Sequence, residues 1–222
     1  MLLEAVNITK KYNGEAVLRE VSLGIAEGES LAITGPSGSG KSTLLSMLGL
    51  LLKPTSGEIL FRAQKVSSLS DNEKSRLRNS AFGFIFQNPQ LIGSLSVLDN
   101  VLVPARLARK GDLQGKAERI LKELGLQDRM HYLPYQLSIG QKRRVAVSRA
   151  LLLDPLLILA DEPTNDLDPE RAAWIGDFLF ELPRKGKTLI LVTHDPDLAS
   201  KAGRLVQISE GGIKDLPAED DY

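Results

Sequence analysis

The chain has 222 residues, 42% of them hydrophobic and 25% charged, and its 28 Lys and Arg residues equal its 28 Asp and Glu residues. This length allows one substantial core, most simply one domain with an inserted subdomain, and the composition indicates an ordinary globular protein rather than a disordered one. A net charge of zero gives no sign of the extended basic surface that binds a long stretch of nucleic acid. A sequence without cysteine has no disulfides, thiol chemistry or Cys-ligated zinc.

The apolar segments are too short for membrane helices. Residues 44–52 and 151–160 are the most apolar stretches, and neither reaches the roughly 20 residues that a membrane-crossing helix needs. The N-terminus carries Glu4 and lacks the basic-then-apolar order of a secretory signal. We therefore expect a protein that remains in the cytoplasm.

The N-terminal region predicts an antiparallel hairpin followed by a strand, a loop and a helix. Residues 2–12 and 16–25 alternate apolar and polar side chains around Asn13-Gly14, a dipeptide that favours a two-residue hairpin turn. The apolar residues 31–33 form the next predicted strand, and an apolar helix is expected over residues 42–52.

Between this strand and this helix lies a phosphate-loop motif of the pattern G-x-x-x-x-G-K-S. Its residues are Gly35, Pro36, Ser37, Gly38, Ser39, Gly40, Lys41 and Ser42, with Thr43 as the next helical residue of the predicted nucleotide site. Glycines let the backbone turn its N–H groups toward phosphate oxygens, and the start of a helix adds partial positive charge. We predict that Lys41 contacts the β- and γ-phosphates and that the Ser42 hydroxyl is a Mg²⁺ ligand.

Five later strands are predicted, and their apolar runs are typical of a parallel sheet with helices on both faces. They cover residues 58–61, 82–86, 156–160, 189–193 and 205–208. Several of them are followed by helical segments, so the expected fold class is α/β.

Polar residues follow three of these strands, at the sheet edge where open α/β folds bind ligands. Asp161 can hold Mg²⁺, and Glu162 can accept a proton from the water that attacks the γ-phosphate. His194 can contact the γ-phosphate and hold that water, and Gln87 can touch both Mg²⁺ and water. Each signal is weak alone, because such residues are also ordinary helix caps or surface side chains. Together with the phosphate loop they predict a nucleotide-hydrolysing site.

The stretch over residues 88–154 carries no strand signal and predicts a helical subdomain inserted into the sheet domain. Its apolar residues recur at helical spacing over residues 113–124. The predicted division is a nucleotide-binding core over residues 1–87 and 155–222, interrupted by the helical subdomain. The acidic end at residues 217–222 is expected to fray.

A second phosphate-binding element is predicted at residues 137–141, ahead of a helix-like segment over residues 142–153. Ser138 would present a hydroxyl, and Gly140 a backbone N–H group, at the helix N-terminus. Within one chain this element does not readily reach the nucleotide held by the phosphate loop. Two chains arranged head to tail about a two-fold axis would place each element against the partner's nucleotide. The alternative is a plain helix N-cap, and the residues alone leave both interpretations open.

In this order the motifs resemble the nucleotide-binding domain of ABC transporters over nearly the whole chain. The matches are residues 35–42 with Walker A, Gln87 with the Q-loop, residues 137–141 with the signature, residues 156–161 with Walker B, Glu162 with the catalytic base, residues 165–168 with the D-loop and His194 with the switch histidine. Tyr12 is similar to the family's aromatic residue that stacks on adenine, although strand packing is the alternative. Ile139 departs from the usual Leu-Ser-Gly-Gly-Gln signature, in which glycine takes its place.

The resemblance implies a P-loop NTPase fold with a mixed, mainly parallel core sheet, an N-terminal antiparallel β subdomain and the inserted helical subdomain. It also implies that ATP and Mg²⁺ are the cofactors. The implied catalytic residues are Lys41, Gln87, Glu162 and His194, and further nucleotide contacts are implied for Ser138, Gly140, Gln141 and Asp168. Two such chains, expected to be identical, would close around two ATP molecules and reopen after hydrolysis.

Within the family, residues 76–79 leading into residues 82–87, together with residues 47–51, resemble the group of lipoprotein-releasing, macrolide-export and cell-division ATPases. This implies an ATP-hydrolysing subunit, peripheral on the cytoplasmic face of the inner (plasma) membrane, that powers separate transmembrane permease subunits and has no nucleic-acid partner. Two alternatives remain. An ABC-type ATPase acting on nucleic acid would have its heads split by a long coiled coil, and a small-molecule kinase would need an acceptor-binding lid but not the signature.

Overall fold

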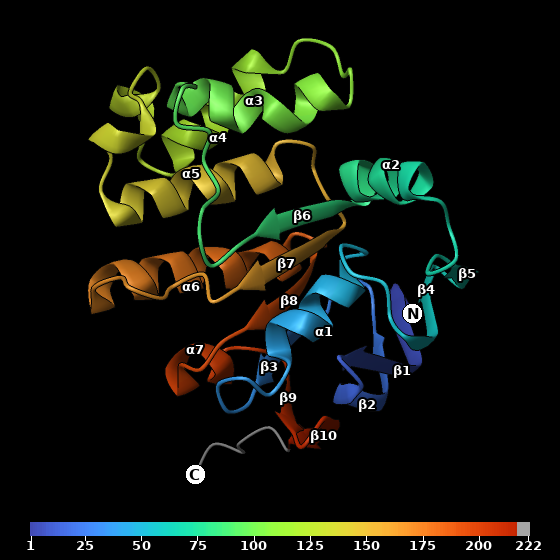
Figure 1. Ribbon diagram of the computed structural model, residues 1–222. Coiled ribbons are helices and arrows are strands. Elements are labelled where there is room, and N and C mark those ends of the chain that lie inside the picture. The colour runs from blue at the N-terminus through green and yellow to red at the C-terminus, as the bar shows by residue number, and fades with distance from the viewer. Residues whose placement is uncertain (217–222) are drawn as a thin grey trace.

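The computed structural model describes residues 1–216, which form two β-sheets and the helices packed around them (Figure 1). The predicted frayed end at residues 217–222 lies outside the described residues. The strands are β1 (Leu3–Tyr12), β2 (Glu15–Ile25), β3 (Ser30–Thr34), β4 (Ser56–Phe61), β5 (Gln64–Lys65), β6 (Phe82–Ile85), β7 (Leu157–Asp161), β8 (Thr188–Val192), β9 (Arg204–Ser209) and β10 (Gly212–Leu216). The helices are α1 (Lys41–Leu48), α2 (Asp71–Ala81), α3 (Val97–Leu107), α4 (Gln114–Glu123), α5 (Ile139–Leu151), α6 (Pro169–Arg184) and α7 (Pro196–Ser200), with short 3-10 turns η1 (Gln127–Arg129) and η2 (Pro134–Gln136).

The N-terminal hairpin forms as predicted, because Asn13 and Gly14 adopt the left-handed backbone that a two-residue turn of type I′ requires. Their φ angles are 49° and 88°, and the pairing of Tyr12 with Glu15 closes the turn. β1 also pairs with β4, so the first sheet has the order β2-β1-β4-β5 and is antiparallel throughout. Residues 58–61 therefore join this sheet, and the expectation that they belong with the parallel strands is wrong.

The second sheet is parallel apart from its edge strand β10, as the apolar runs predict. Its order is β10-β9-β3-β8-β7-β6, and every neighbouring pair except β10 and β9 is parallel. The central strands β3, β8 and β7 are neighbours although they are far apart along the chain. Because parallel strands end at a common edge, the loops that follow these strands lie side by side.

Both faces of this parallel sheet are covered, since alternate residues of its central strands belong to different apolar clusters. Leu157 and Leu159 of β7 pack in the cluster that includes α1, whereas Ile158 and Ala160 pack in the cluster that includes α6. Every residue of β8 is buried. Burial on both faces accounts for the continuous apolar runs in the sequence.

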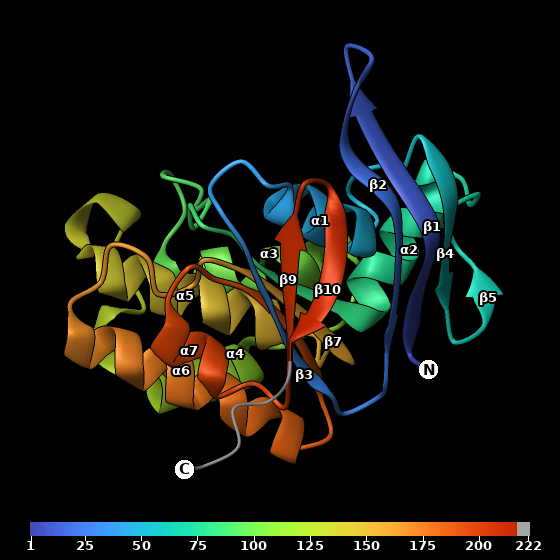
Figure 2. The same cartoon turned by 90° about the horizontal axis from the view of Figure 1, so that it is seen from below.

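The helices α3, α4 and α5 pack together beyond β6, with α5 between the sheet and the other two helices (Figure 1, Figure 2). Their apolar faces form a third cluster that includes Val101, Leu121 and Val145. As a result α5 contacts both the strand β6 and the outer helices. No helix within residues 1–216 combines the length and the apolar character that crossing a membrane requires.

The predicted bounds of two helices are wrong. The helix α1 ends at Leu48 rather than at residue 52, because Leu50 takes a left-handed conformation with a φ of 57°, which turns the backbone out of the helix. The helix α5 begins at Ile139 rather than at Lys142, because Ser138 and Gln141 bond each other's backbone N–H groups in a capping box.

The helix α2 has no counterpart in the sequence prediction, because its only buried residue is Ala81 and it lacks an apolar stripe. Its start is nevertheless encoded. The Ser70 hydroxyl accepts a hydrogen bond from the Glu73 N–H, and the Glu73 carboxylate accepts one from the Ser70 N–H at 2.8 Å. This Ser-x-x-Glu capping box is the signal that locates the helix.

Candidate functional site

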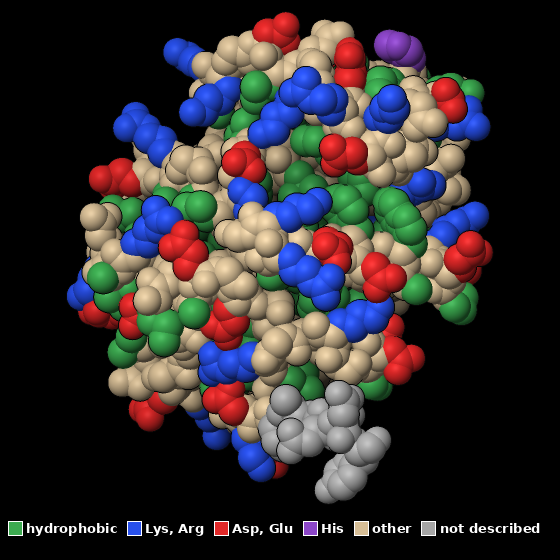
Figure 3. Space-filling model, turned by 180° about the vertical axis from the view of Figure 1, so that it is seen from behind, with side chains coloured by type: hydrophobic (Ala, Val, Ile, Leu, Met, Phe, Trp, Pro, Cys, Tyr) green, Lys and Arg blue, Asp and Glu red, His purple; other side chains and the backbone are tan. Residues whose placement is uncertain are grey.

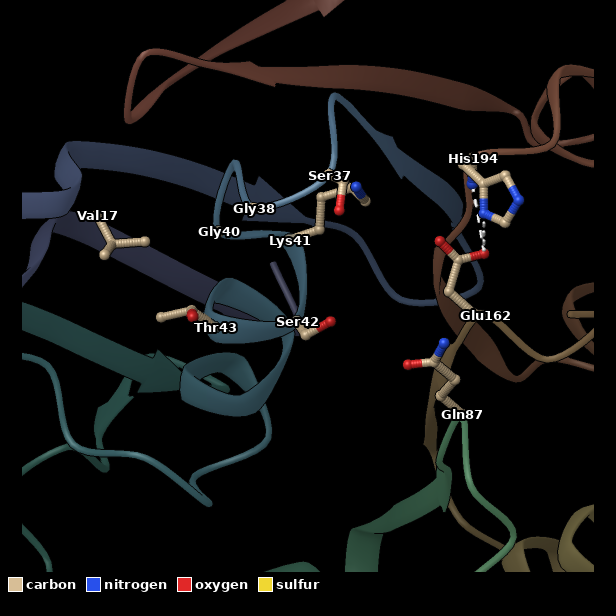
Figure 4. A pocket seen from close by; sticks show the side chains of 10 residues that line it. All are labelled: Val17, Ser37, Gly38, Gly40, Lys41, Ser42, Thr43, Gln87, Glu162 and His194. Carbon is tan, nitrogen blue, oxygen red and sulfur yellow. Dashed lines mark hydrogen bonds and ion pairs between the residues drawn. The ribbon is translucent and has the colours of Figure 1, made fainter.

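A cavity of about 640 Å³ opens at the carboxyl edge of the parallel sheet, a size that suits a nucleotide. The phosphate loop and α1 form one wall, and three residues that follow β6, β7 and β8 form the other (Figure 4). The lining residues are Val17, Ser37, Gly38, Gly40, Lys41, Ser42, Thr43, Gln87, Glu162 and His194. All of them except Val17 are predicted site residues, so folding brings together segments that are far apart in the sequence.

The phosphate loop turns sharply because its glycines adopt left-handed backbone angles. The φ angle is 144° at Gly35, 78° at Gly38 and 101° at Gly40, values that residues with a Cβ rarely adopt. A Cβ on Gly35 would also lie 2.4 Å from the carbonyl oxygen of Ile208 in β9. The requirement for glycine at position 35 is therefore steric as well as conformational.

The helix α1 begins at the cavity without a side-chain cap. Its N-cap is Gly40, and no side chain within residues 1–216 caps this helix start, whereas α2, α3, α5 and α6 are capped by Ser or Asp. The first-turn N–H groups of Lys41, Ser42 and Thr43 are therefore available to an anion in the cavity, and the partial positive charge of the helix start favours one.

The side chain of Lys41 lies in the wall of the cavity. Its Nζ donates to the carbonyl oxygens of Gly35 at 2.8 Å and Pro36 at 3.0 Å, so its partners are neutral. The buried Ser39 hydroxyl next to it has no hydrogen-bond partner among the described residues. A cation bonded only to neutral carbonyls, next to an uncapped helix start, fits the phosphate groups of a nucleotide.

Ser42 and Asp161 form a donor set that fits a divalent cation. The Ser42 hydroxyl donates to Asp161 Oδ1 at 3.0 Å, which joins α1 to the end of β7. Burial raises the pKa of Asp161 above its ordinary value, the hydrogen bond from Ser42 opposes this rise, and the neighbouring Glu162 adds to it. Because burial and Glu162 both disfavour the ionised carboxylate, a cation beside it would relieve both effects. Hard oxygen ligands of this kind are those that Mg²⁺ accepts.

Glu162 lies across the cavity from the phosphate loop, with His194 next to it on the same side of the cavity (Figure 4). Glu162 Oε2 is hydrogen-bonded to His194 Nδ1 at 2.9 Å and accepts a longer bond of 3.4 Å from the His194 backbone N–H. The other carboxylate oxygen points toward the phosphate loop, and the Gln87 amide points into the same space (Figure 4). A carboxylate and an amide placed in this way can orient and deprotonate a water molecule next to a phosphate.

The backbone at Glu162 is strained. Its φ angle is 46°, in the left-handed region that non-glycine residues rarely occupy, and the residue is only 9% exposed. Such a conformation persists only where the surrounding structure imposes it, and strain of this kind gathers at functional sites.

Tyr12 does not line the cavity. It ends β1 with 46% of its surface exposed, and Lys10 Nζ lies 5.1 Å from the centre of its ring. Val17 of β2 lines the cavity instead, and sequence reasoning missed it because a β-branched residue in a strand carries no signal of its own. The predicted contact of Tyr12 with adenine stays a prediction.

The residues of the second phosphate-binding element do not line the cavity either. The Ser138 hydroxyl accepts a hydrogen bond from the Gln141 N–H at 3.2 Å, and Gly140 packs against the side chain of Arg171. Asp168 caps α6 and pairs with Arg171 at 3.0 Å. Within one chain Ser138, Gln141 and Asp168 take part in helix caps, as in the alternative interpretation, and the predicted nucleotide contacts would need a second chain.

Comparison with known proteins identifies the family. The family model described as ABC transporter matches residues 18–165, a span that includes the phosphate loop, the signature and the end of β7. The chain belongs to the ABC transporter family. The enzyme class that the motifs predict, an ABC-type ATPase, is thereby confirmed.

The curated relatives of this cassette include long and short proteins. The macrolide export ATP-binding/permease protein MacB of Chlorobaculum tepidum is 42% identical over 219 residues, which are 96% of this chain and 34% of that protein. The MacB protein of Wolinella succinogenes is 44% identical over 218 residues, again 96% of this chain and 34% of the relative. An ABC transporter ATP-binding protein of Methanocaldococcus jannaschii is 42% identical over 221 residues, 97% of this chain and 99% of the relative. The cassette thus spans about a third of the length of the macrolide export proteins that it matches.

A solved structure of a dimeric ATP-binding cassette, in a post-hydrolysis state bound to ADP and Pi, has the same fold. Its TM-score is 0.92 at 37% sequence identity, over 99% of this chain and 100% of that one. The predicted fold, an α/β P-loop NTPase with a mainly parallel sheet and an N-terminal antiparallel sheet, is confirmed.

Proposed function

We propose that this cassette hydrolyses ATP in the cavity between the phosphate loop and Glu162, and that two copies use the reaction to drive a membrane permease. The observation that carries the proposal is the placement of Glu162 opposite a loop whose free N–H groups and Lys41 fit phosphates. The Ser42–Asp161 pair at the same edge would supply two oxygen ligands of the kind that Mg²⁺ accepts.

The proposed roles follow from these positions. Ser42 and Asp161 would hold Mg²⁺, with Gln87 reaching it as well, and the bound ion would neutralise charge on the β- and γ-phosphates. Lys41 would contact the same two phosphates. Glu162 would accept a proton from the attacking water, and His194 would hold the Glu162 carboxylate and contact the γ-phosphate.

We also propose that two identical chains close around two ATP molecules. Ser138, Gly140, Gln141 and Asp168 would each contact the nucleotide of the partner chain, since none of them lines the cavity of its own chain. Ser138 and Asp168 are exposed, and the solved relative is a dimer. The contacts made through the γ-phosphate would be lost on hydrolysis, so the dimer would reopen.

A charge placed at Ile139 tests the dimer. In a Glu162→Gln background, ATP with Mg²⁺ should shift the sedimenting mass from 24.2 kDa to twice that value, and ADP should not. Adding Ile139→Glu should keep the protein monomeric, because a carboxylate there would face the partner's phosphates. The change should not unfold the chain, since Ile139 is 57% exposed and an acidic residue suits the first turn of a helix.

Leu107→Glu is the matched control, because Leu107 of α3 is also apolar and 73% exposed. It should leave ATP-dependent dimerisation intact. A parent protein that stays monomeric with ATP, or a Leu107→Glu protein that loses dimerisation as fully as Ile139→Glu, would contradict the proposed arrangement.

We propose that separate membrane-spanning permease subunits couple to the dimer at the cytoplasmic face of the inner membrane. In this proposal residues 88–154 form the helical subdomain that receives the permease, and residues 1–87 and 155–222 form the nucleotide-binding core. The names of the macrolide export relatives support coupling to a permease. On the face drawn in Figure 3, basic and acidic side chains are interspersed, so this face does not present the basic stripe that is typical of nucleic-acid binding.

Affinity capture tests the coupling. Tagged Glu162→Gln protein, incubated with ATP in detergent-solubilised membranes of its source cells, should retain a multispan permease, and the retained amount should fall when ADP replaces ATP. Capture of only soluble or nucleic-acid-bound proteins would instead favour an ABC-type ATPase outside transport.

A further inference from the structure

Arg143 of α5 is the largest fully buried side chain among the described residues. The proposed mechanism does not use its charge. It is 1% exposed, and burial lowers the pKa of its guanidinium below the ordinary value while Asp166 opposes that effect. A buried cation is costly unless hydrogen bonds compensate it. The partners of Arg143 therefore indicate what the structure gains from it.

The guanidinium of Arg143 bonds three peptide carbonyls in two loops. Nη1 donates to Phe86 O at 3.0 Å and also to Gln87 O, and Nη2 donates to Asn165 O at 3.1 Å. The Nε atom is buried and has no partner among the described residues. All these acceptors are neutral carbonyls. Arg143 therefore links the backbones of two loops and does not hydrogen-bond a carboxylate.

The two loops held by Arg143 carry Gln87 and Glu162, which line the cavity opposite the phosphate loop. They leave the neighbouring parallel strands β6 and β7, whose last pairing is Ile85 with Ala160. Gln87 belongs to the first loop. Glu162 belongs to the second, where the Asn165 N–H donates to Glu162 O at 3.2 Å. One guanidinium thus bonds the Gln87 backbone directly and is linked to the Glu162 backbone through a single residue, Asn165.

The link through Asn165 helps to hold Glu162 in its left-handed conformation, in which the φ angle is 46°. A left-handed glutamate needs neighbouring contacts to hold it, and these are the hydrogen bonds of its N–H to Val192 O at 2.9 Å and of its carbonyl to the Asn165 N–H. Arg143 bonds the carbonyl oxygen of the same residue, Asn165. Without Arg143, the carbonyls of Phe86, Gln87 and Asn165 lose this donor, and the loop from Glu162 to Asn165 can relax.

We propose that Arg143 is a positioning residue for ATP hydrolysis, which holds the Gln87 and Glu162 loops at a fixed separation and joins both to α5. This inference rests on the proposed reaction in the cavity. A planar guanidinium can span the two loops because Nη1 and Nη2 point to different acceptors, whereas the single ammonium of a lysine is a point donor.

Arg149, six residues further along α5, provides the matched control. It donates to Gln90 O at 2.8 Å and to Pro89 O at 2.6 Å, so it also bonds carbonyls of the loop after β6. Arg149 has no bond to the loop after Glu162. A comparison of Arg143 with Arg149 therefore separates positioning of the two loops from general support of the first one.

Steady-state phosphate release with ATP and Mg²⁺ tests the proposal, measured on the full chain with Arg143→Met, Arg143→Lys and Arg149→Met beside the unmodified protein. For Arg143→Met we expect kcat to fall by about 10- to 100-fold, because small displacements of reacting groups have effects of this size. KM should stay within about threefold, since the phosphate loop is not touched. Arg143→Lys should show an intermediate kcat, and Arg149→Met should keep kcat within about threefold.

Amide hydrogen exchange provides the structural readout. Arg143→Met should raise exchange in residues 86–90 and in residues 162–168, whereas Arg149→Met should raise it only in residues 86–90. If Arg143→Met does not fold, Arg143→Lys replaces it in both measurements.

The outcomes are distinct. An unmodified protein that releases no phosphate overturns the proposed reaction. An active protein whose Arg143 variants keep the full kcat, or whose Arg149→Met variant loses as much kcat as Arg143→Met, overturns the positioning role alone. Unchanged exchange in residues 162–168 of the Arg143 variants overturns it as well.

Discussion

Replacing Glu162 by glutamine should lower ATP turnover by about 10²- to 10⁴-fold, the usual range for losing a general base. The amide keeps the size of the side chain and can still bond His194, whose Nδ1 lies 2.9 Å from the carboxylate. It cannot take a proton from water at neutral pH. Binding of ATP should persist, because the phosphate loop and Ser42 lie on the opposite wall of the cavity.

The measurement is phosphate release at saturating ATP, together with a titration of ATP binding on the same preparation. Glu123→Gln is the control, since Glu123 lies exposed on α4, and it should leave both quantities unchanged. Near-normal turnover in Glu162→Gln would reject Glu162 as the general base and would favour His194 in that role.

Gly35→Ala should have the largest effect on folding among the phosphate-loop substitutions. The new Cβ would lie 2.4 Å from Ile208 O and 2.9 Å from Ser39 Oγ, and the first of these is backbone in the neighbouring strand β9. A left-handed alanine costs about 1 to 2 kcal/mol, and overpacking of this kind costs about 1 to 3 kcal/mol more. The expected loss in the free energy of unfolding is therefore about 2 to 5 kcal/mol.

Urea unfolding without nucleotide measures this loss, with Gly38→Ala as the control. Gly38 also has a positive φ, of 78°, but a Cβ there meets no atom within 4 Å. Its cost should be about 1 to 2 kcal/mol, from the backbone alone. Equal losses in the two variants would show that the contact with Ile208 has no energetic weight. Gly35→Ala should also bind ATP more weakly, because the Gly35 carbonyl is one of the two acceptors of Lys41.

Most of the cavity could be predicted because its residues follow local patterns at strand ends. The glycines fix the loop, and the carboxyl ends of parallel strands share one edge, so Gln87, Glu162 and His194 meet there without any knowledge of the packing. The position of Tyr12 relative to the cavity depends on how the antiparallel sheet sits against α1. That placement is tertiary, and neither the absence of Tyr12 from the cavity wall nor the presence of Val17 in it could be predicted.

The errors in the fold have the same origin. The apolar run after α1 continues into the core through a turn at Leu50, so hydrophobicity alone extends the helix too far. The polar α2 shows no periodicity, although its Ser70 capping box was readable. Arg143 could not be assigned a role from sequence, because its acceptors at Gln87 and Asn165 are 56 and 22 residues away.

The strand order also bears on how the protein is made. The strand β3, which leads into the phosphate loop, reaches β7 only through β8, since β8 pairs with both. Until residues 188–192 have left the ribosome, β8 is missing from the sheet. Without β8, the strands β3 and β7, which carry the two walls of the cavity, are not held next to each other. Assembly through such distant pairings is intrinsically slow, and ligands that bind only the finished structure add stability, about 2.7 kcal/mol at 100 times Kd. ATP binding is therefore expected to begin only after residues 188–192 have been synthesised and paired, and bound nucleotide would then stabilise chains whose central sheet has formed.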